Sequence, residues 1–233
     1  MGKEKVTRRL ETAFFMSDTT LLYLKLFFTS FLVTLVTTPM VRSLALRFGV
    51  LDYPGETRVH TRPTPRLGGV AIFLGFVLSI VLFSNYRATE GILVGGAIIL
   101  LIGLVDDIRG LSATVKLLLI LTATYFLSHY DIVLTIFQNY YLNLLFTLLW
   151  VVAVVSAFNA VDNMDGLACG LAFIAATGYF LIALQTYQMQ WGLLALALMG
   201  STLAFLKYNF NNASIFLGDS GSFFLGFILA TLG

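Results

Sequence analysis

Long apolar runs alternate with short polar segments along the whole 233-residue chain. Because about 20 apolar helical residues cross a bilayer, this pattern predicts an all-α fold, a polytopic transmembrane helical bundle of about eight spans. The polar segments between the runs are then candidates for loops at the two membrane faces. The expected apolar runs are residues 21–40, 68–84, 91–105, 115–127, 141–158, 167–184, 191–206 and 223–233.

Several of these runs are short for a membrane span. The run at 91–105 has 15 residues, which as a helix would rise about 22 Å. Local thinning of the bilayer or submerged helix ends can accommodate a helix this short. We therefore expect the polar helix ends at the level of the lipid phosphates or slightly deeper in the membrane. The run at 223–233 would rise about 16 Å. We therefore expect a sequence cut short at its C-terminus within a membrane helix, with weak or no activity for the 233-residue form.

Alternate crossing places four polar segments on one face of the membrane: residues 41–67, 106–107, 159–166 and 207–222. Eight cations lie on that face against Arg87 in the opposite loops, so the positive-inside bias makes it cytoplasmic. If the four cations of the basic N-terminal segment, residues 1–20, are counted with Arg87, the comparison becomes eight cations against five. Residues 21–233 form the transmembrane domain. The eight cations are Arg42, Arg47, Arg58, Arg62, Arg66, Arg109, Lys116 and Lys207.

Composition excludes several classes of protein. Hydrophobic residues make up 58% of the chain and charged residues 11%, and the mean hydropathy of +0.90 is too high for a soluble domain. The net charge of +2, with no basic stripe, argues against nucleic acid as a partner. The single Cys169 excludes an internal disulfide and a multi-cysteine metal site, and its small neighbours favour a role in helix packing.

Three acidic clusters lie at the ends of apolar runs, within residues 103–107, 159–166 and 218–222. Carboxylates at membrane depth are costly, and they are kept where they are paired, hydrated or functional. The clusters hold five of the 12 acidic residues, which predicts a metal and phosphate site. The five are Asp106, Asp107, Asp162, Asp165 and Asp219.

The first cluster contains two adjacent aspartates, Asp106 and Asp107. Neighbouring carboxylates in a medium of low dielectric constant both ionise only beside a cation. Mg²⁺ is a suitable cation, because it takes one or two carboxylates together with substrate phosphates and water. A polar helix end with Asp–Arg pairing, with Arg109 close by in the sequence, is the alternative interpretation.

The second cluster repeats polar residues at three-residue intervals, at Asn159, Asp162 and Asp165. This spacing places them along one side of a helix end, where Gly166 can release the backbone from the helix. One Asn and two Asp on one side can bind a metal, a sugar hydroxyl or the edge of a base. A solvated helix cap is the alternative.

The third cluster, residues 218–222, joins a tight loop to the start of the last apolar run. Small residues there would expose backbone N–H groups that favour phosphate, and a metal would have to bridge Asp219 to that phosphate. Ordinary helix N-capping by Asp and Ser is the alternative. The basic loop at 52–69, which contains His60 and Arg66, suits an anionic ligand or simply orients the protein in the membrane.

Taken in order, these segments resemble the polyprenyl-phosphate N-acetylhexosamine-1-phosphate transferases over about residues 42–227. The resemblance implies transfer of a sugar 1-phosphate from a UDP-sugar to undecaprenyl phosphate, with Mg²⁺ or Mn²⁺, and release of UMP. The Asp-Asn-Met-Asp-Gly-Leu-Ala segment at 162–168 is similar to the bacterial branch that uses UDP-N-acetylglucosamine. The branch that uses UDP-N-acetylmuramoyl-pentapeptide is the near alternative.

The same resemblance implies a role for each polar residue. Asp106 and Asp107 match the catalytic pair, and Asp219, together with Asp162, matches the metal ligands. Ser156 and Ile120 depart from the family pattern, which often has Asn and Gln there. The residues implied in substrate binding are Asn159, Asp162, Asp165, Lys116, His60 and Arg66.

The implied setting is a bacterial plasma membrane, crossed several times, at the first membrane step of cell-envelope polysaccharide synthesis. Two rivals from other classes are a cation-coupled transporter and an inactive membrane scaffold. A transporter would place its ionisable groups near the bilayer midplane, whereas these aspartates lie at helix ends. The oligomeric state stays open, with a homodimer among the options.

Overall fold

The computed structural model describes residues 2–54, 62–84, 87–130 and 132–233, with the backbone alone at 2–17 and 87–88. Within these ranges eight α-helices and one two-stranded ribbon form, and the ribbon pairs β1 (Leu51–Asp52) with β2 (Thr64–Pro65). The helices are α1 (Gly2–Phe48), α2 (Gly68–Phe83), α3 (Arg87–Arg109), α4 (Ala113–Leu127), α5 (Tyr140–Val161), α6 (Leu167–Gln185), α7 (Met189–Asn209) and α8 (Gly218–Leu232).

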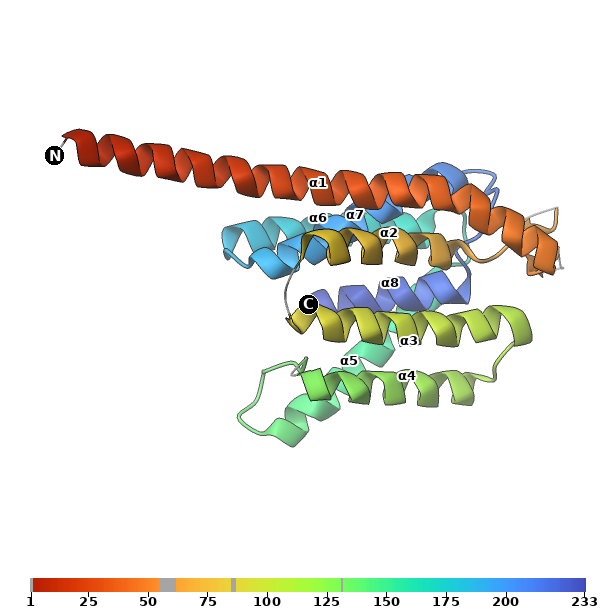
Figure 1. Cartoon of the computed structure of the whole chain (residues 1–233). Helices are drawn as coiled ribbons and strands as arrows, with labels where there is room; N and C mark the ends of the chain where they lie inside the picture. Colours follow the sequence, from red (N-terminus) through yellow and green to blue (C-terminus); the bar gives the residue numbers. More distant parts are fainter. Residues whose placement is uncertain (1, 55–61, 85–86, 131) are drawn as a thin grey trace.

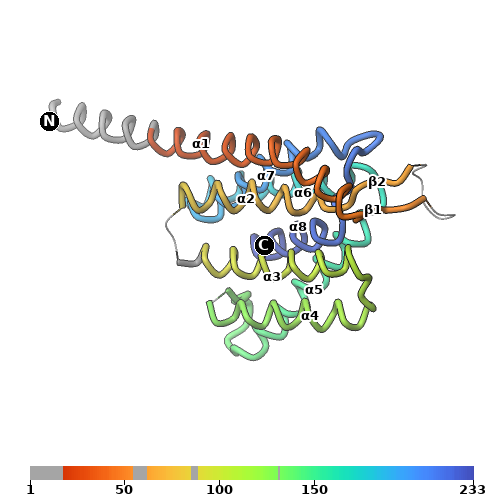
Figure 2. The backbone as a smooth tube through the Cα atoms, turned by 45° about the vertical axis from the view of Figure 1, so that its right-hand side comes forward, coloured from red at the N-terminus to blue at the C-terminus, as the bar shows by residue number. Residues whose placement is uncertain are grey.

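Successive helices run in alternate directions, so that four connections meet at one end of the bundle (Figure 1). These connections are residues 49–67, 110–112, 162–166 and 210–217. The β-ribbon lies at the same end (Figure 2). The predicted grouping of the polar segments at one end of the helices is therefore confirmed.

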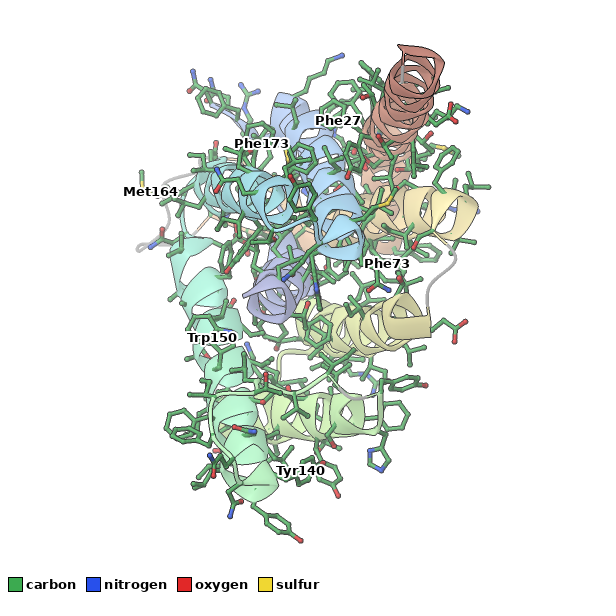
Figure 3. All side chains as sticks on the ribbon, turned by 90° about the vertical axis from the view of Figure 1, so that its left-hand side faces the viewer. Phe27, Phe73, Tyr140, Trp150, Met164 and Phe173 are labelled. Carbon is green, nitrogen blue, oxygen red and sulfur yellow. The ribbon has the colours of Figure 1, made fainter. Side chains whose placement is uncertain are left out.

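Helix α8 forms the centre of the bundle and packs against α2, α3, α5 and α6 (Figures 1 and 3). Its aromatic side chains are almost completely buried, Phe223 and Phe224 among them. A helix surrounded by other helices needs no polar face, which explains why the sequence after its polar first turn, from Phe223 to Ala230, is apolar on all sides. Gly103 of α3 makes the packing close, because a Cβ at that position would lie 2.5 Å from backbone atoms of Asp219 and Ser220.

The prediction of a helical membrane protein is confirmed, but the count of eight spans is not. Among the described residues, five helices are long and apolar enough to cross a membrane: α1 from Asp18 onward, α3 from Thr89 onward, α5, α6 and α7. Helices α2, α4 and α8 have only 16, 15 and 15 residues. Such lengths rise roughly 22 to 24 Å, which is less than the hydrocarbon core of about 30 Å.

Two of the expected boundaries are wrong, because polar residues continue a helix beyond its apolar run. The run at 91–105 is part of the 23-residue helix α3, whose last turn contains Asp106 and Asp107. The first helix continues to Phe48, so Arg42 and Arg47 are helical rather than part of a polar loop. Helix α1 runs through residue 20 without a break.

Helix α1 contains Pro39, which has no N–H to donate to the carbonyl of Leu35 four residues earlier. The hydroxyl of Tyr208, at the end of α7, donates to that carbonyl at 3.0 Å. Beyond this point, the Arg42 Nε donates to the carbonyl of Ser214 at 3.0 Å. These contacts fasten the end of α1 to the segment that leads into α8.

Candidate active site

Helix α8 begins at Gly218, earlier than the expected start near 223, and its first turn is held by a residue from α3. The carboxylate of Asp107 accepts the backbone N–H of Asp219 at 2.9 Å and that of Ser220 at 3.0 Å. Leu217, at the N-cap position, makes no side-chain cap. Asp107 therefore caps the N-terminus of α8 from another helix, in the manner of an Asp N-cap.

Two of the N–H groups in residues 218–222 that we expected to be exposed for phosphate therefore already have a partner, the carboxylate of Asp107. The anion at that helix N-terminus is the protein's own carboxylate, whose side chain is 0% exposed. The Arg66 Nε lies 3.4 Å from the Asp107 Oδ1 and compensates its charge. Gly218 permits the close approach, since its φ of 75° suits glycine and a Cβ would lie 2.7 Å from the Asp107 Oδ2.

The neighbouring Asp106 points to different partners. Its Oδ1 accepts the backbone N–H of Leu111 at 2.6 Å, and its Oδ2 forms an ion pair with the Lys116 ammonium of α4. The same Lys116 Nζ lies 3.3 Å from the Asp219 Oδ2. The cation expected beside the acidic pair is therefore present as Lys116 and Arg66, and the exposed Arg109 pairs with neither aspartate.

The residues of the second cluster do not follow one helical line. Helix α5 ends at Val161, Asp162 takes the C-cap position and Asp165 lies in the following turn. Asn159, still in the helix, accepts a hydrogen bond from the Ser222 hydroxyl at 3.4 Å. The exposed Asp165 accepts the backbone N–H of Ala213 at 2.8 Å. The prediction of a continuous polar side was wrong because the helix stops between its members.

Gly166 has a different role from the one expected of it. With a φ of 72° it occupies the N-cap of α6 instead of ending α5. Its N–H is accepted by the side chain of Asn209 at 3.1 Å, and the amide of Asn209 donates to the carbonyl of Ile215 at 3.1 Å. This buried Asn209 ties two loops of the site together. We had not singled it out, because a lone Asn at a helix end carries no distinctive pattern.

A cleft of about 1410 Å³ opens at this end of the bundle. Of the predicted site residues, Asp162, Asp165, Asp219 and Arg66 line it, whereas Asp106, Asp107, Lys116 and Asn159 lie outside its lining. His60 lies outside the described residues. The lining also includes residues that we did not predict as site members, namely Arg42, Asp52, Arg62, Asn163, Met164, Asn209, Phe210, Asn211, Asn212 and Phe216.

Burial and neighbouring carboxylates disfavour the charged form of Asp162 in the cleft. The pKa of the Asp162 carboxyl is raised well above its usual value, first by burial and then by the charges of Asp219 and Asp107, while Arg66 acts in the opposite direction. No three His, Cys, Asp or Glu side chains converge as a metal site in the described ranges. A hard cation that takes one or two carboxylates and completes its shell with phosphate and water nevertheless fits Asp162 and Asp219.

Comparison with known proteins decides the family. Residues 89–233, more than half of the chain, match the model of glycosyl transferase family 4. This protein belongs to glycosyl transferase family 4. The matched region begins in α3 and contains Asp106, Asp107, Asp162 and Asp219.

Curated relatives agree with this assignment. The chain is 36% identical over 217 residues to a probable undecaprenyl-phosphate N-acetylglucosaminyl 1-phosphate transferase of Bacillus subtilis, covering 88% of this chain and 61% of the relative. It is 37% identical over 231 residues to the decaprenyl-phosphate N-acetylglucosaminephosphotransferase of Mycobacterium tuberculosis, covering 87% of this chain and 57% of the relative. A phospho-N-acetylmuramoyl-pentapeptide-transferase of Thermoanaerobacter is 31% identical over 215 residues, and the match covers 83% of this chain and 67% of the relative. The chain therefore spans about three fifths of the first two relatives.

Proposed function

We propose that this protein transfers N-acetylglucosamine 1-phosphate, or a related N-acetylhexosamine 1-phosphate, from a UDP-sugar to undecaprenyl phosphate and releases UMP. The observation that carries the proposal is the meeting of Asp162, Asp219 and Arg66 in one large cleft at the end of a membrane bundle. The names of the two relatives at 36% and 37% identity support the N-acetylglucosamine donor. The muramoyl-pentapeptide donor is the second candidate, supported by relatives at 31% identity.

We further propose that Asp219 and Asp162 hold Mg²⁺ or Mn²⁺. Either ion would neutralise charge on the donor diphosphate when bound. Arg66 lies at the edge of the same cleft, and one of its guanidinium nitrogens, Nη1, is 3.2 Å from the Asp52 carboxylate. Its remaining donors suit an anionic donor substrate, since a guanidinium pairs with phosphate oxygens in a fixed geometry.

In the proposed reaction, an oxygen of the acceptor phosphate bonds to the phosphorus that carries the sugar. The bond from that phosphorus to the UMP oxygen breaks, and UMP leaves with the electron pair, so that no water is consumed. A phosphate monoester with a second pKa of about 6 is mostly doubly ionised at neutral pH. Positioning and charge neutralisation are then the main tasks of the protein.

The two paired aspartates have separate tasks in this proposal. Both oxygens of Asp107 already accept backbone N–H groups of α8, so Asp107 positions Asp219 and takes no proton. Asp106 orients Lys116, whose ammonium lies between Asp106 and Asp219. That ammonium is placed to compensate the charge of an incoming phosphate.

We also propose that the cleft faces the cytoplasm and that the product serves as the lipid carrier for an envelope polysaccharide. The first statement rests on the excess of Lys and Arg in the connections and the adjoining helix ends on the cleft side of the bundle. The test is to supply membranes carrying the protein with undecaprenyl phosphate, Mg²⁺ and either UDP-N-acetylglucosamine or UDP-N-acetylmuramoyl-pentapeptide. We expect a lipid-linked sugar diphosphate from the first donor; a product from the second donor alone would replace the proposal by the second candidate.

A further inference from the structure

The connection between α7 and α8, residues 210–217, is closed at its base by hydrogen bonds to the end of α7. The carbonyl of Tyr208 accepts the Ser214 N–H at 2.8 Å and the Ser214 hydroxyl at 3.0 Å. One residue further along, the side-chain amide of Asn209 donates to the Ile215 carbonyl at 3.1 Å. The end of α7 therefore fixes the path by which the chain enters α8.

The same chain segment is paired on another side with the start of α2. The Phe216 N–H donates to the carbonyl of Pro65 at 2.7 Å, and the Phe216 carbonyl accepts the N–H of Gly68 at 3.0 Å. The residues just before Asp219 are thus held from two directions, by the start of α2 and by Asn209.

The turn after α5, residues 162–166, contains the second carboxylate of the proposed metal site. In the part of the chain that the structure describes, the Asp162 side chain makes no hydrogen bond or ion pair. Its position therefore depends on how the turn is anchored. At the end of the turn, the Gly166 N–H donates to the Asn209 Oδ1 at 3.1 Å. Phe210 lies over the same glycine, since a Cβ there would be 2.9 Å from the Phe210 ring.

Asn209 bonds both segments with one side chain, because an amide has a donor and an acceptor. Asn209 is only 3% exposed. Its loss would leave the Gly166 N–H and the Ile215 carbonyl without partners where water has little access, which is costly. A second bond between the turn and the loop joins Asp165 to the Ala213 N–H at an exposed position, where water can replace a lost partner. Asn209 is therefore the stronger link.

We propose that Asn209 is a positioning residue that fixes the spacing between Asp162 and Asp219, and thereby the affinity of the cleft for a divalent cation. The inference rests on the proposed function, in which these two aspartates hold Mg²⁺ or Mn²⁺. Mg²⁺ requires nearly ideal octahedral geometry, so ligands on two separate loops bind it well only if the loops keep a constant separation. The Asn209 amide bonds Gly166, four residues after Asp162, and Ile215, four residues before Asp219.

The test measures Mn²⁺ binding by electron paramagnetic resonance, with the full protein in lipid nanodiscs and neither substrate present. Asn143→Leu is the matched control for Asn209→Leu. Asn143 is also buried, at 8% exposure, and it bonds backbone groups of Ile136 and Phe137 at the opposite end of α5 from the cleft. We expect the Kd for Mn²⁺ to rise about tenfold or more in Asn209→Leu, since substitution of groups that orient metal ligands typically costs about 10–100-fold in affinity.

The control should keep the Kd of the native protein. Equal Kd values in Asn209→Leu and the native protein, or no Mn²⁺ binding by the native protein, would overturn the proposal. If Asn209→Leu does not fold, Asn209→Ser takes its place, because this smaller polar side chain cannot reach both backbone groups. Since no substrate is present, a loss of Mn²⁺ binding confined to the Asn209 variant would support the inference even if no UDP-sugar reacted.

Hydrogen exchange separates positioning from direct contact of Asn209 with the cation. We expect the Gly166 N–H to exchange several-fold faster in Asn209→Leu, because its partner is gone. In Asp219→Asn, which should also lose Mn²⁺ binding, the exchange of this N–H should stay as in the native protein. Unchanged exchange in Asn209→Leu would refute the positioning role.

Discussion

The substitution Asp107→Asn tests whether this aspartate holds the N-terminus of α8. The carboxylate accepts two backbone N–H groups, whereas an Asn side chain has one acceptor oxygen and would turn its NH₂ group toward the other N–H. A hydrogen bond to a charged group contributes about 1.5–3 kcal/mol. The loss of a negative charge at a helix N-terminus adds about 0.3–1 kcal/mol. We therefore expect a loss of about 2–4 kcal/mol in unfolding free energy.

The assay is reversible unfolding of the purified protein in detergent or bicelles, with Asp165→Asn as the matched control. The exposed Asp165 accepts a single described backbone N–H, that of Ala213, and the Asn oxygen can keep this bond. The control should therefore lose less than about 1 kcal/mol. Equal losses in the two variants would refute the capping role of Asp107 and return it to the candidates for direct chemistry.

Three further predictions concern the site. Asp219→Asn should abolish transfer while the protein still inserts into membranes, because a neutral amide is a poor Mg²⁺ ligand; near-native turnover at limiting Mg²⁺ would remove Asp219 from the metal site. Lys116→Met should raise the KM for the acceptor phosphate, since its ammonium lies between Asp106 and Asp219, and an unchanged KM would exclude a role in acceptor binding. Met164→Cys, at a position that lines the cleft and is 63% exposed, should escape an impermeant thiol reagent applied to intact cells, whereas Tyr187→Cys should react; the opposite pattern would reverse the topology.

Much of the fold follows from local sequence. Each expected apolar run corresponds to one helix because an apolar stretch of helical length forms a helix in a membrane whatever its neighbours are. The gathering of the acidic clusters at one end follows from the alternation of these runs. The burial of Cys169, whose thiol donates to the Thr202 carbonyl at 3.3 Å, also agrees with the packing role expected from its small neighbours.

The interior of the site depends on contacts between distant residues, and local sequence does not contain them. Asp107 and the N–H of Asp219 are 112 residues apart in the chain, so nothing near residue 218 indicates that its helix is already capped. The three-residue spacing of polar residues also does not show where helix α5 ends. Asp162 continues the interval from Asn159, but it occupies the C-cap position. For the same reason, the fact that Asp106 and Asp107 are adjacent in the sequence does not reveal that they have separate tasks.

The central claim is that this cleft transfers a sugar phosphate between a UDP-sugar and undecaprenyl phosphate. The most direct measurement is the exchange of radiolabelled UMP into UDP-N-acetylglucosamine, catalysed by membranes that carry the protein and undecaprenyl phosphate. The account predicts exchange that requires the lipid phosphate and Mg²⁺ and disappears in Asp219→Asn. Exchange that proceeds equally in the Asp219 variant, or without the lipid phosphate, would contradict it.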